Sequence, residues 1–313
     1  MSTATEHHRA RVGRTPSSPG RLRLGEWIAA LKGSFSAFMR DDCMGLSQQI
    51  AYSSLLAFFP AVAFLIGALG VFNLFDNVKQ LLDPIAPEGV ITFITNLQSD
   101  SSGGTSGVAF VIGFFGAVWA ASGAMGTIMK AVNRAYELQE TRPFWKSRIV
   151  AIVLVVATGL TTAGVFLLIV VGGSLGDAIA KKAGLGGVFH WTWAILRWPI
   201  AFCAILLFFA LVYYLAPNMR QRNWKWVTPG SILGGALWLV LSGLFALYVT
   251  FAGNYTKTYG TLASGIILLL WLNYSAFAVL YGAELNSELE RQADIRAAGG
   301  EHAGLVKPVR RGS

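Results

Sequence analysis

Charged residues are scarce in this sequence. Only 13% of its 313 residues are Asp, Glu, Lys or Arg and 54% are hydrophobic, whereas a soluble globular domain carries about 25% charged residues. The scarcity is concentrated in six long stretches that contain no charged residue at all. They are Cys43 to Phe75, Ser101 to Met129, Ile149 to Gly176, Trp198 to Met219, Trp226 to Thr256 and Thr258 to Ala283. This composition excludes an ordinary soluble protein and indicates one embedded in lipid.

Cysteine and histidine are also rare, and neither is spaced as a metal site. The two cysteines lie at or within uncharged stretches, where isolated thiols are typical packing residues. The sequence also lacks the phosphate-binding, metallopeptidase and hydrolase motifs, and its carboxylates are scattered over separate segments. The residues concerned are Cys43, Cys203, His7, His8, His190 and His302. We therefore expect no metal, no cofactor and no conventional enzyme active site.

Each uncharged stretch is long enough to cross a membrane as a helix. About 20 apolar residues span the hydrocarbon core, and a helix satisfies its own backbone hydrogen bonds there. The apolar runs are continuous and do not alternate, which disfavours membrane-spanning strands. We therefore predict an all-α, polytopic membrane protein with six transmembrane helices. Their expected ranges are about 47–72, 107–129, 149–175, 195–217, 228–252 and 260–284.

The basic residues predict the orientation of these spans. Seven Lys and Arg precede span 1, five lie between spans 2 and 3, three between spans 4 and 5, and five follow span 6. The other three connections share only five. The positive-inside rule therefore places both termini and the connections after even-numbered spans in the cytoplasm. The protein is therefore expected to be a multi-pass membrane protein.

The spans form one transmembrane domain, 43–290, between two cytoplasmic tails at 1–22 and 291–313. The first tail is rich in Arg, Ser, Pro and Thr and is expected to be disordered. Residues 23–42 carry apolar side chains at steps of three and four and predict an amphipathic interfacial helix. Its apolar face is expected either to lie on the membrane surface or to pack on the bundle. The basic face favours anionic lipid head groups as a partner, and no nucleic acid is expected.

Helix packing is indicated by a proline and by small residues within the spans. Pro60 removes a backbone donor in the middle of span 1 and predicts a kink there. Small side chains four residues apart let helices approach closely. They are Gly116, Ala120 and Ala124 in span 2, and Gly230 and Gly234 in span 5. A short likeness between spans 2 and 5 leaves open an inverted repeat.

A few polar residues lie within the spans or at their cytoplasmic ends. Asn273 lies near the middle of span 6 and shares a helix face with Glu284, roughly 16 Å further along. We hypothesise that Glu284 pairs with Lys130 or Arg134 in a polar vestibule; the alternative is a structural ion pair between two helix ends. The candidate polar pathway or vestibule comprises Tyr52, Lys130, Asn133, Arg134, Asn273 and Glu284.

Four stretches resemble the YihY/BrkB family of bacterial inner-membrane proteins, formerly labelled ribonuclease BN. They are QIAYSSLLAFFP (49–60), WAASGAMGTIMKAVNRAYELQETRPFWKSR (119–148), YYLAPNMRQRNWKWVTPG (213–230) and YGTLASGIILLLWLNYSAFAVLYGAEL (259–285). Ala57 departs from the family, where Ser is often found. The resemblance implies a six-helix inner-membrane protein, an association with virulence and serum resistance, and a role in transport or export.

Three functions compete at this point. A transporter-like or exporter-like protein with an unknown small-molecule substrate is the first. The second is a non-transporting envelope scaffold or virulence factor, and the third is a membrane-bound tRNA ribonuclease, which the scattered carboxylates disfavour. Substrate, coupling ion and assembly into a homo-oligomer are left open by the sequence.

Overall fold

The computed structural model describes residues 24–82, 88–101, 105–171, 187–219, 228–251 and 261–297. Within these ranges the chain is helical and contains no strand. Six of the helices are long and apolar enough to cross a membrane, which confirms the all-α fold with six spans. The tail at 1–22 and the residues after 297 lie outside the described ranges.

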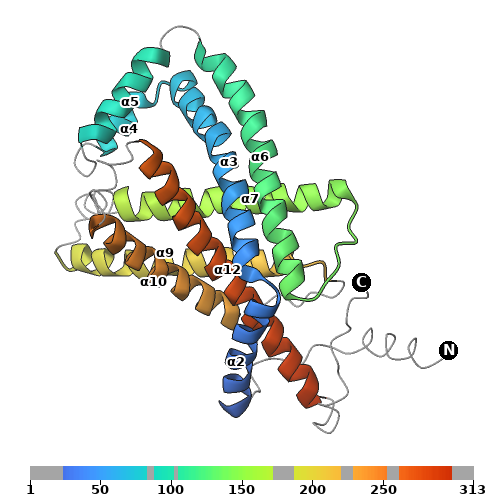
Figure 1. Ribbon diagram of the computed structural model, residues 1–313. Coiled ribbons are helices and arrows are strands. Elements are labelled where there is room, and N and C mark those ends of the chain that lie inside the picture. The colour runs from blue at the N-terminus through green and yellow to red at the C-terminus, as the bar shows by residue number, and fades with distance from the viewer. Residues whose placement is uncertain are drawn as a thin grey trace.

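Figure 1 shows the helices in their order along the chain. They are α2 (Leu24–Arg40), α3 (Cys43–Val71), α4 (Phe75–Leu82), α5 (Glu88–Ser101), α6 (Thr105–Ala135), α7 (Phe144–Phe166), the π-helical turn η2 (Leu167–Val171), α9 (Gly187–Leu215), α10 (Pro229–Phe251) and α12 (Thr261–Ala297). The six spanning helices are α3, α6, α7, α9, α10 and α12.

Helix ends differ from the expected span limits mainly where charged residues occur. Helix α7 begins at Phe144, five residues before the expected start at 149, and includes Lys146 and Arg148. Helix α12 continues to Ala297, so residues 291–297, expected in the tail, are helical. The reason is physical: charged residues end the hydrocarbon-buried segment, but the backbone hydrogen bonding of a helix continues through them into water.

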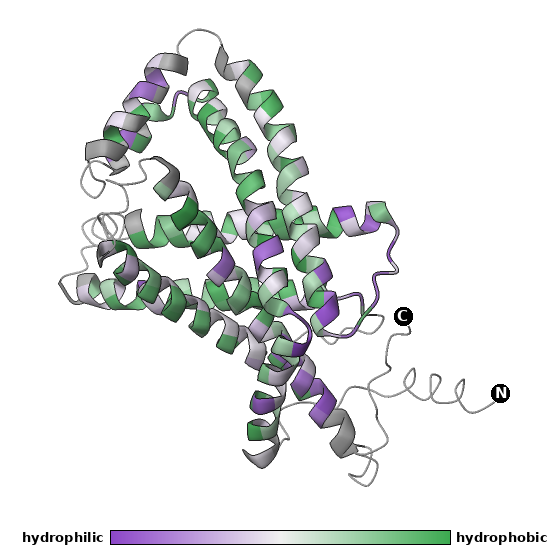
Figure 2. Ribbon diagram, viewed as in Figure 1, coloured by the Kyte–Doolittle hydropathy of each residue, from purple (hydrophilic) through white to green (hydrophobic). Residues whose placement is uncertain are grey.

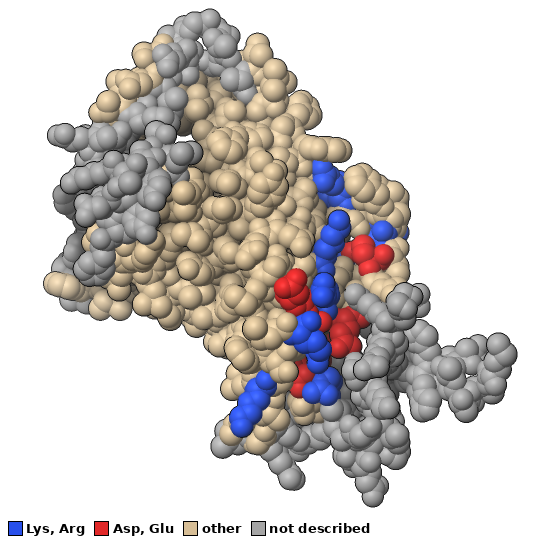
Figure 3. Space-filling view, in the orientation of Figure 1, with Lys and Arg blue, Asp and Glu red and all other residues tan. Residues whose placement is uncertain are grey.

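The spanning helices converge at one end and diverge at the other (Figure 1). Helices α3 and α6 lie against each other, α10 lies against α12, and α12 also contacts α3. Towards the opposite end, the α3 and α6 pair draws away from α7, α9 and α10, with α12 between them. Many hydrophilic residues gather where the helices converge (Figure 2), and the charged side chains visible in Figure 3 lie there too. We call this the charged end, which the positive-inside rule assigns to the cytoplasm.

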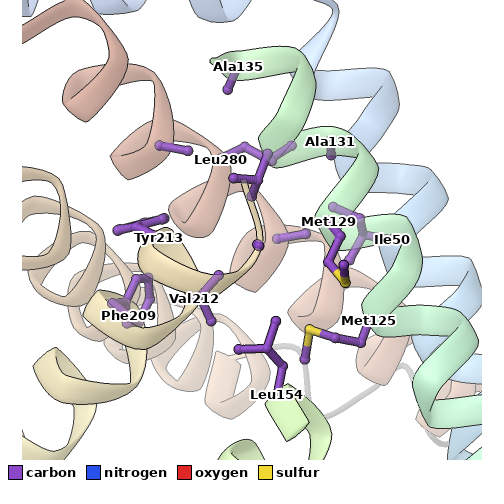
Figure 4. Close-up of a cluster of buried hydrophobic side chains, with 14 of the residues drawn as sticks. Ile50, Met125, Met129, Ala131, Ala135, Leu154, Phe209, Val212, Tyr213 and Leu280 are labelled. Carbon is purple, nitrogen blue, oxygen red and sulfur yellow. The ribbon is translucent and has the colours of Figure 1, made fainter. Parts of the chain in front are cut away.

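The buried core lies in the halves of the helices nearest the charged end. In α7 the buried residues are Ala151 and Leu154, both within the first half of the helix. Ile50, Met125, Met129, Leu154, Phe209, Val212, Tyr213 and Leu280 meet in one cluster (Figure 4). Side chains such as Leu160 in α7 and Ile195 in α9, which lie further along, are more than 60% exposed. The helices are therefore held together mainly at one end.

Helix α2 packs on the bundle through one of its faces. Its Ala30, Ser34 and Phe38 are buried, and the Phe38 ring lies 4.5 Å from that of Phe277 in α12. The following turn places Asp42 in the left-handed region, where its side chain accepts a hydrogen bond from the Gly45 amide and caps α3. The expected amphipathic helix is confirmed, and packing on the bundle accounts for one of its two sides.

Small residues allow close helix crossings, as the sequence predicts, at three of the positions named: Gly116, Gly230 and Gly234. A Cβ atom on Gly234 would lie 2.8 Å from the Tyr213 hydroxyl, and one on Gly116 would lie 3.4 Å from the Pro60 side chain. Helix α3 stays helical through Pro60, and the predicted kink stays a prediction. Gly113 brings α6 nearer still, because its Cβ atom would lie 2.6 Å from the backbone of Phe64.

Candidate functional site

Glu284 is the most deeply buried acidic side chain of the described residues. It lies in α12 at the charged end and is 1% exposed. The Cys43 thiol, at the first residue of α3, donates a hydrogen bond of 3.3 Å to its Oε1 atom. The hydroxyl of Ser47 bonds the Cys43 carbonyl one turn further along. A carboxyl group is thus enclosed between the start of α3 and α12.

The ion pair expected between Glu284 and Lys130 or Arg134 is not formed. Both basic side chains are exposed at the end of α6, and no cation of the described residues lies within ion-pair distance of Glu284. A charged group on a flexible side chain is better solvated at the surface than drawn into a packed core. The structure therefore places Glu284 in the protein interior and the two cations outside it.

Asn133 belongs to a second polar network, which joins the end of α6 to the end of α9. Its side chain is buried; the amide donates a 3.0 Å hydrogen bond to Glu140 and accepts one of 2.7 Å from the Asn218 backbone. The Asn218 side chain donates to the Gln139 carbonyl and to the Thr141 hydroxyl. Both the nitrogen and the oxygen of the Asn133 amide are thus engaged in structural hydrogen bonds.

Arg142 closes this network on the last carbonyls of α9. Its guanidinium pairs with both carboxylate oxygens of Glu140, at 2.6 and 2.8 Å, and donates to the carbonyls of Leu215 and Ala216. A cation at the end of a helix also interacts favourably with the helix dipole. The Arg142 side chain holds the pKa of Glu140 below its ordinary range, mainly through the hydrogen bond, although partial burial opposes this.

A third polar network joins the start of α10 to α12. The Asn286 side chain accepts a hydrogen bond of 2.8 Å from the Gly230 amide and donates one of 3.0 Å to Thr228. Gly230 and Gly282 cross so closely that a Cβ atom on either would collide with the carbonyl of the other. The Asn286 amide also bonds the phenol of Tyr136, whose pKa is raised well above its ordinary value by burial.

The remaining pathway candidates are separated from these networks. Tyr52 is 61% exposed on α3. Asn273 is half-buried in α12, and its amide has no hydrogen-bond partner among the described residues. The structure therefore groups the candidates into a buried carboxylate (Glu284), a structural amide (Asn133), exposed cations and an amide (Asn273) without a partner among the described residues.

Sequence reasoning missed several residues of the charged end. Glu140, Arg142 and Asn218 lie in connections between spans, and Asn286 follows Glu284 by two residues. Glu140 and Arg142 in one short connection were a usable signal for an ion pair, but their partners on α9 depend on the tertiary fold. The cysteines behave as expected in one respect, because Cys43 and Cys203 are free and form no disulfide.

Metal ligands do not gather at any point of the described ranges. No group of three or more His, Cys, Asp or Glu residues there could hold a metal ion. Glu284 and Cys43 are two such residues side by side, and Glu288, one turn along α12, is turned to Arg291 and Gln292. What the described geometry offers is hydrogen bonding and helix clamping.

Comparison with known proteins gives a family match over most of the chain. The family model described as virulence factor BrkB matches residues 34–304. A ribonuclease-like protein of Bacillus subtilis, YfkH, is 28% identical over 86% of this chain and 98% of its own length. A UPF0761 membrane protein of Idiomarina loihiensis is 26% identical over 84% of the chain and 91% of its own length. No solved structure gives a significant match.

Proposed function

The chain belongs to the virulence factor BrkB family of multi-pass membrane proteins, and from this premise we propose that it is a transporter-like or exporter-like protein of the bacterial inner membrane. The observation that carries the proposal is the unequal packing of its two ends. The buried core and three polar networks hold the helices together at the charged end, while the opposite ends diverge (Figure 1). A transporter that exposes its site to one side at a time needs such an asymmetry.

The charged end has the features of a closed gate. Networks around Asn133, Arg142 and Asn286 tie α6, α9, α10 and α12 together there. Each consists of discrete hydrogen bonds that a conformational change would break and replace as a set. A scaffold would benefit from the same clamps, but it would gain nothing from divergence at the other end. The substrate route therefore enters from the opposite end in this conformation.

Asn273 supports a polar route within the spans. An amide that faces lipid without a partner costs free energy, because the hydrocarbon core supplies no hydrogen bond. Asn273 is half-buried on α12, the helix that lies between the two diverging groups. Water or a substrate group would satisfy it, and the absence of charged side chains nearby in α12 favours a neutral polar or amphiphilic contact there.

Thiol labelling tests this proposal without knowledge of the substrate. Asn273→Cys, in a Cys203→Ala background, is treated with a membrane-impermeant maleimide from each side of oriented vesicles. We expect modification from the side of the diverging ends only. Leu280→Cys in the same background is the control and should stay unmodified, because Leu280 is fully buried. An Asn273→Cys thiol that resists the reagent from both sides would contradict a polar route and favour the scaffold.

Transport itself is tested by the small molecules that cells release. Untargeted mass spectrometry compares the medium of cells that express the wild type, Glu284→Gln or no protein. If the protein is an exporter, at least one compound in the medium should depend on the wild-type chain.

Cleavage of tRNA is a third candidate function, because one relative is named ribonuclease-like. We expect the purified chain to leave tRNA intact with and without added Mg²⁺. Cleavage that requires the metal would replace the transport proposal.

A further inference from the structure

Helix α2 carries a second apolar face that the bundle leaves uncovered. Ile28, Leu31, Phe35 and Met39 are between 43% and 59% exposed and lie at steps of three, four and four. On a helix such residues form one stripe along one side. The residues that pack on α12 lie on the other side of the helix and include Ala30 and Phe38. The helix is therefore apolar on two faces, of which one is in contact with protein.

Contacts with α12 set the rotation of this helix. Ala30 forms a small buried cluster with Leu285 and Leu289. Gly33 lies against the carboxylate of Glu288, where a Cβ atom would come within 2.5 Å of Oε1. The side of α2 that carries Ala30 and Gly33 thus faces α12. The stripe of Ile28, Leu31, Phe35 and Met39 is consequently held outward at the charged end.

A polar row runs beside the outer stripe. Lys32, Ser36 and Arg40 are exposed and follow one another at steps of four, so they occupy one edge of the stripe. Arg40 lies 3.8 Å from Asp41 but remains 60% exposed. The first 40 residues contain seven Lys and Arg against two Glu. An apolar stripe bordered by basic side chains is the arrangement of helices that lie in the head-group region of anionic membranes.

We infer that the outer stripe of α2 inserts into the lipid surface at the charged end, with Lys32 and Arg40 at the level of anionic head groups. The occupant of this face is the bilayer that surrounds the spans, because the helix joins α3 through the short turn at Asp41 and Asp42 and cannot leave the membrane surface. The stripe supplies the apolar contact, and the two cations supply selectivity for anionic lipid. This inference is independent of the transport proposal.

Site-directed fluorescence in the full chain tests the inference. Phe35→Cys, in the Cys203→Ala background, is labelled with an environment-sensitive NBD dye and reconstituted into vesicles of phosphatidylcholine, with or without phosphatidylglycerol. Ser36→Cys is the matched control, since it is the next residue and also exposed but belongs to the polar row. We expect brominated lipid chains to quench the dye at 35 strongly and at 36 weakly, with more quenching at 35 in anionic vesicles.

A double variant that lacks both cations separates the apolar from the electrostatic contribution to the contact between α2 and lipid. Lys32→Gln with Arg40→Gln should remove the additional quenching at 35 in anionic vesicles and leave the quenching in phosphatidylcholine unchanged. Met39→Cys replaces Phe35→Cys if the latter fails to fold. Equal quenching at 35 and 36, or none at 35, would overturn the inference. So would disulfide formation between two copies through Phe35→Cys, because a second copy would then cover the stripe.

Discussion

Glu137 adopts a backbone conformation that glutamate rarely occupies. Its φ angle is 52°, in the left-handed region, and the amides of Glu137 and Leu138 donate to the carbonyls of Arg134 and Asn133. These two bonds form the Schellman motif, which usually has glycine at the left-handed position. Asn73 occupies the same position after α3, where asparagine tolerates it better. The end of α6 thus stores strain in a single residue.

Glycine at position 137 should relieve that strain. We expect Glu137→Gly to stabilise the protein by about 1 kcal/mol, because the left-handed conformation costs glycine nothing. The measurement is thermal unfolding in detergent followed by tryptophan fluorescence. Glu137→Val is the control and should unfold at a lower temperature than the wild type. An unfolding temperature for Glu137→Gly below that of the wild type would show that the Glu137 side chain itself stabilises the fold.

Glu140 makes stability depend on pH in the acid range. Its folded-state pKa lies below the ordinary value of 4.5 because of the Arg142 side chain. A group with a lowered pKa contributes stability above its unfolded-state pKa and loses it as the pH falls through its folded-state pKa. We therefore expect wild type and Glu140→Gln to differ in unfolding temperature by a constant amount above about pH 5.

Below that pH the same difference should shrink. Protonation of Glu140 removes the charge that Arg142 pairs with, so the wild type approaches the stability of the Gln variant. Since the Glu140 side chain is partly exposed, the effect is smaller than that of a buried pair. A difference that persists unchanged down to pH 3 would mean that the ionisation of Glu140 is not its source, and no difference at any pH would mean that the Gln amide replaces the carboxylate without loss.

Helices α10 and α12 cross in backbone contact at one point. The hydroxyl of Tyr213 also enters this crossing and donates to the Val279 carbonyl at 2.8 Å. A side chain at Gly282 would meet both that hydroxyl and the Gly230 carbonyl. The crossing explains why two elements separated in the sequence act as one unit at the charged end. A single added methyl group at this crossing should therefore change the stability of the protein.

Gly282→Ala should destabilise the protein by more than about 2 kcal/mol, because neither the Gly230 carbonyl nor the backbone of α10 can move easily to make room for the added methyl group. Gly265→Ala is the matched control in the same helix, as nothing lies within 4 Å of its added Cβ atom. That control should be neutral or stabilising by up to about 1 kcal/mol, the usual preference for Ala over Gly in helices. Equal unfolding temperatures for the two variants would mean that α10 and α12 part readily.

Convergence at the charged end dominates the molecule as a whole. The networks there are built on connections and helix ends, and the charged side chains that Figure 3 shows lie in the same region. The topology brings these helix ends together, because α6, α9 and α12 end at the charged end while α3, α7 and α10 begin there. Opposite charges and caps therefore meet without any charged residue having to enter the hydrocarbon core. Beyond the far end of α3, Asp76 pairs with Lys79 within α4 and accepts a hydrogen bond from Gln98, which joins α4 and α5 to each other.

Reporter fusions test the orientation of the whole molecule. The positive-inside rule predicts that the connection after α6 and the carboxyl terminus lie on the cytoplasmic side. Green fluorescent protein fused after Ser313 should fluoresce, and alkaline phosphatase inserted at Gln139 should be inactive. Alkaline phosphatase inserted after Asn96, in α5, is the control and should be active. Activity at Gln139 together with fluorescence at the terminus would contradict six spans.

Much of the fold could be predicted because lipid imposes simple rules. Uncharged runs identify six spans, and steps of three and four identify α2, without any knowledge of the tertiary structure. Gly230 and Gly234 were recognisable as contact positions for the same reason. The partner of Glu284 was not predictable, because a helix period gives the face of a residue but not which helix covers it. Opposite charges at one depth suggested Lys130 and Arg134, and the packed thiol of Cys43 occupies that place instead.

The sequence by itself determined the solvent of this protein, the number of its spans and the end at which its charges gather. Those properties follow from transfer free energies, which depend on residue type and order along the chain. Only the tertiary structure decided which polar groups meet, that the helices hold together at one end, and which side of α2 remains uncovered. Those properties depend on helix rotation and crossing, which many weak contacts between distant residues set together.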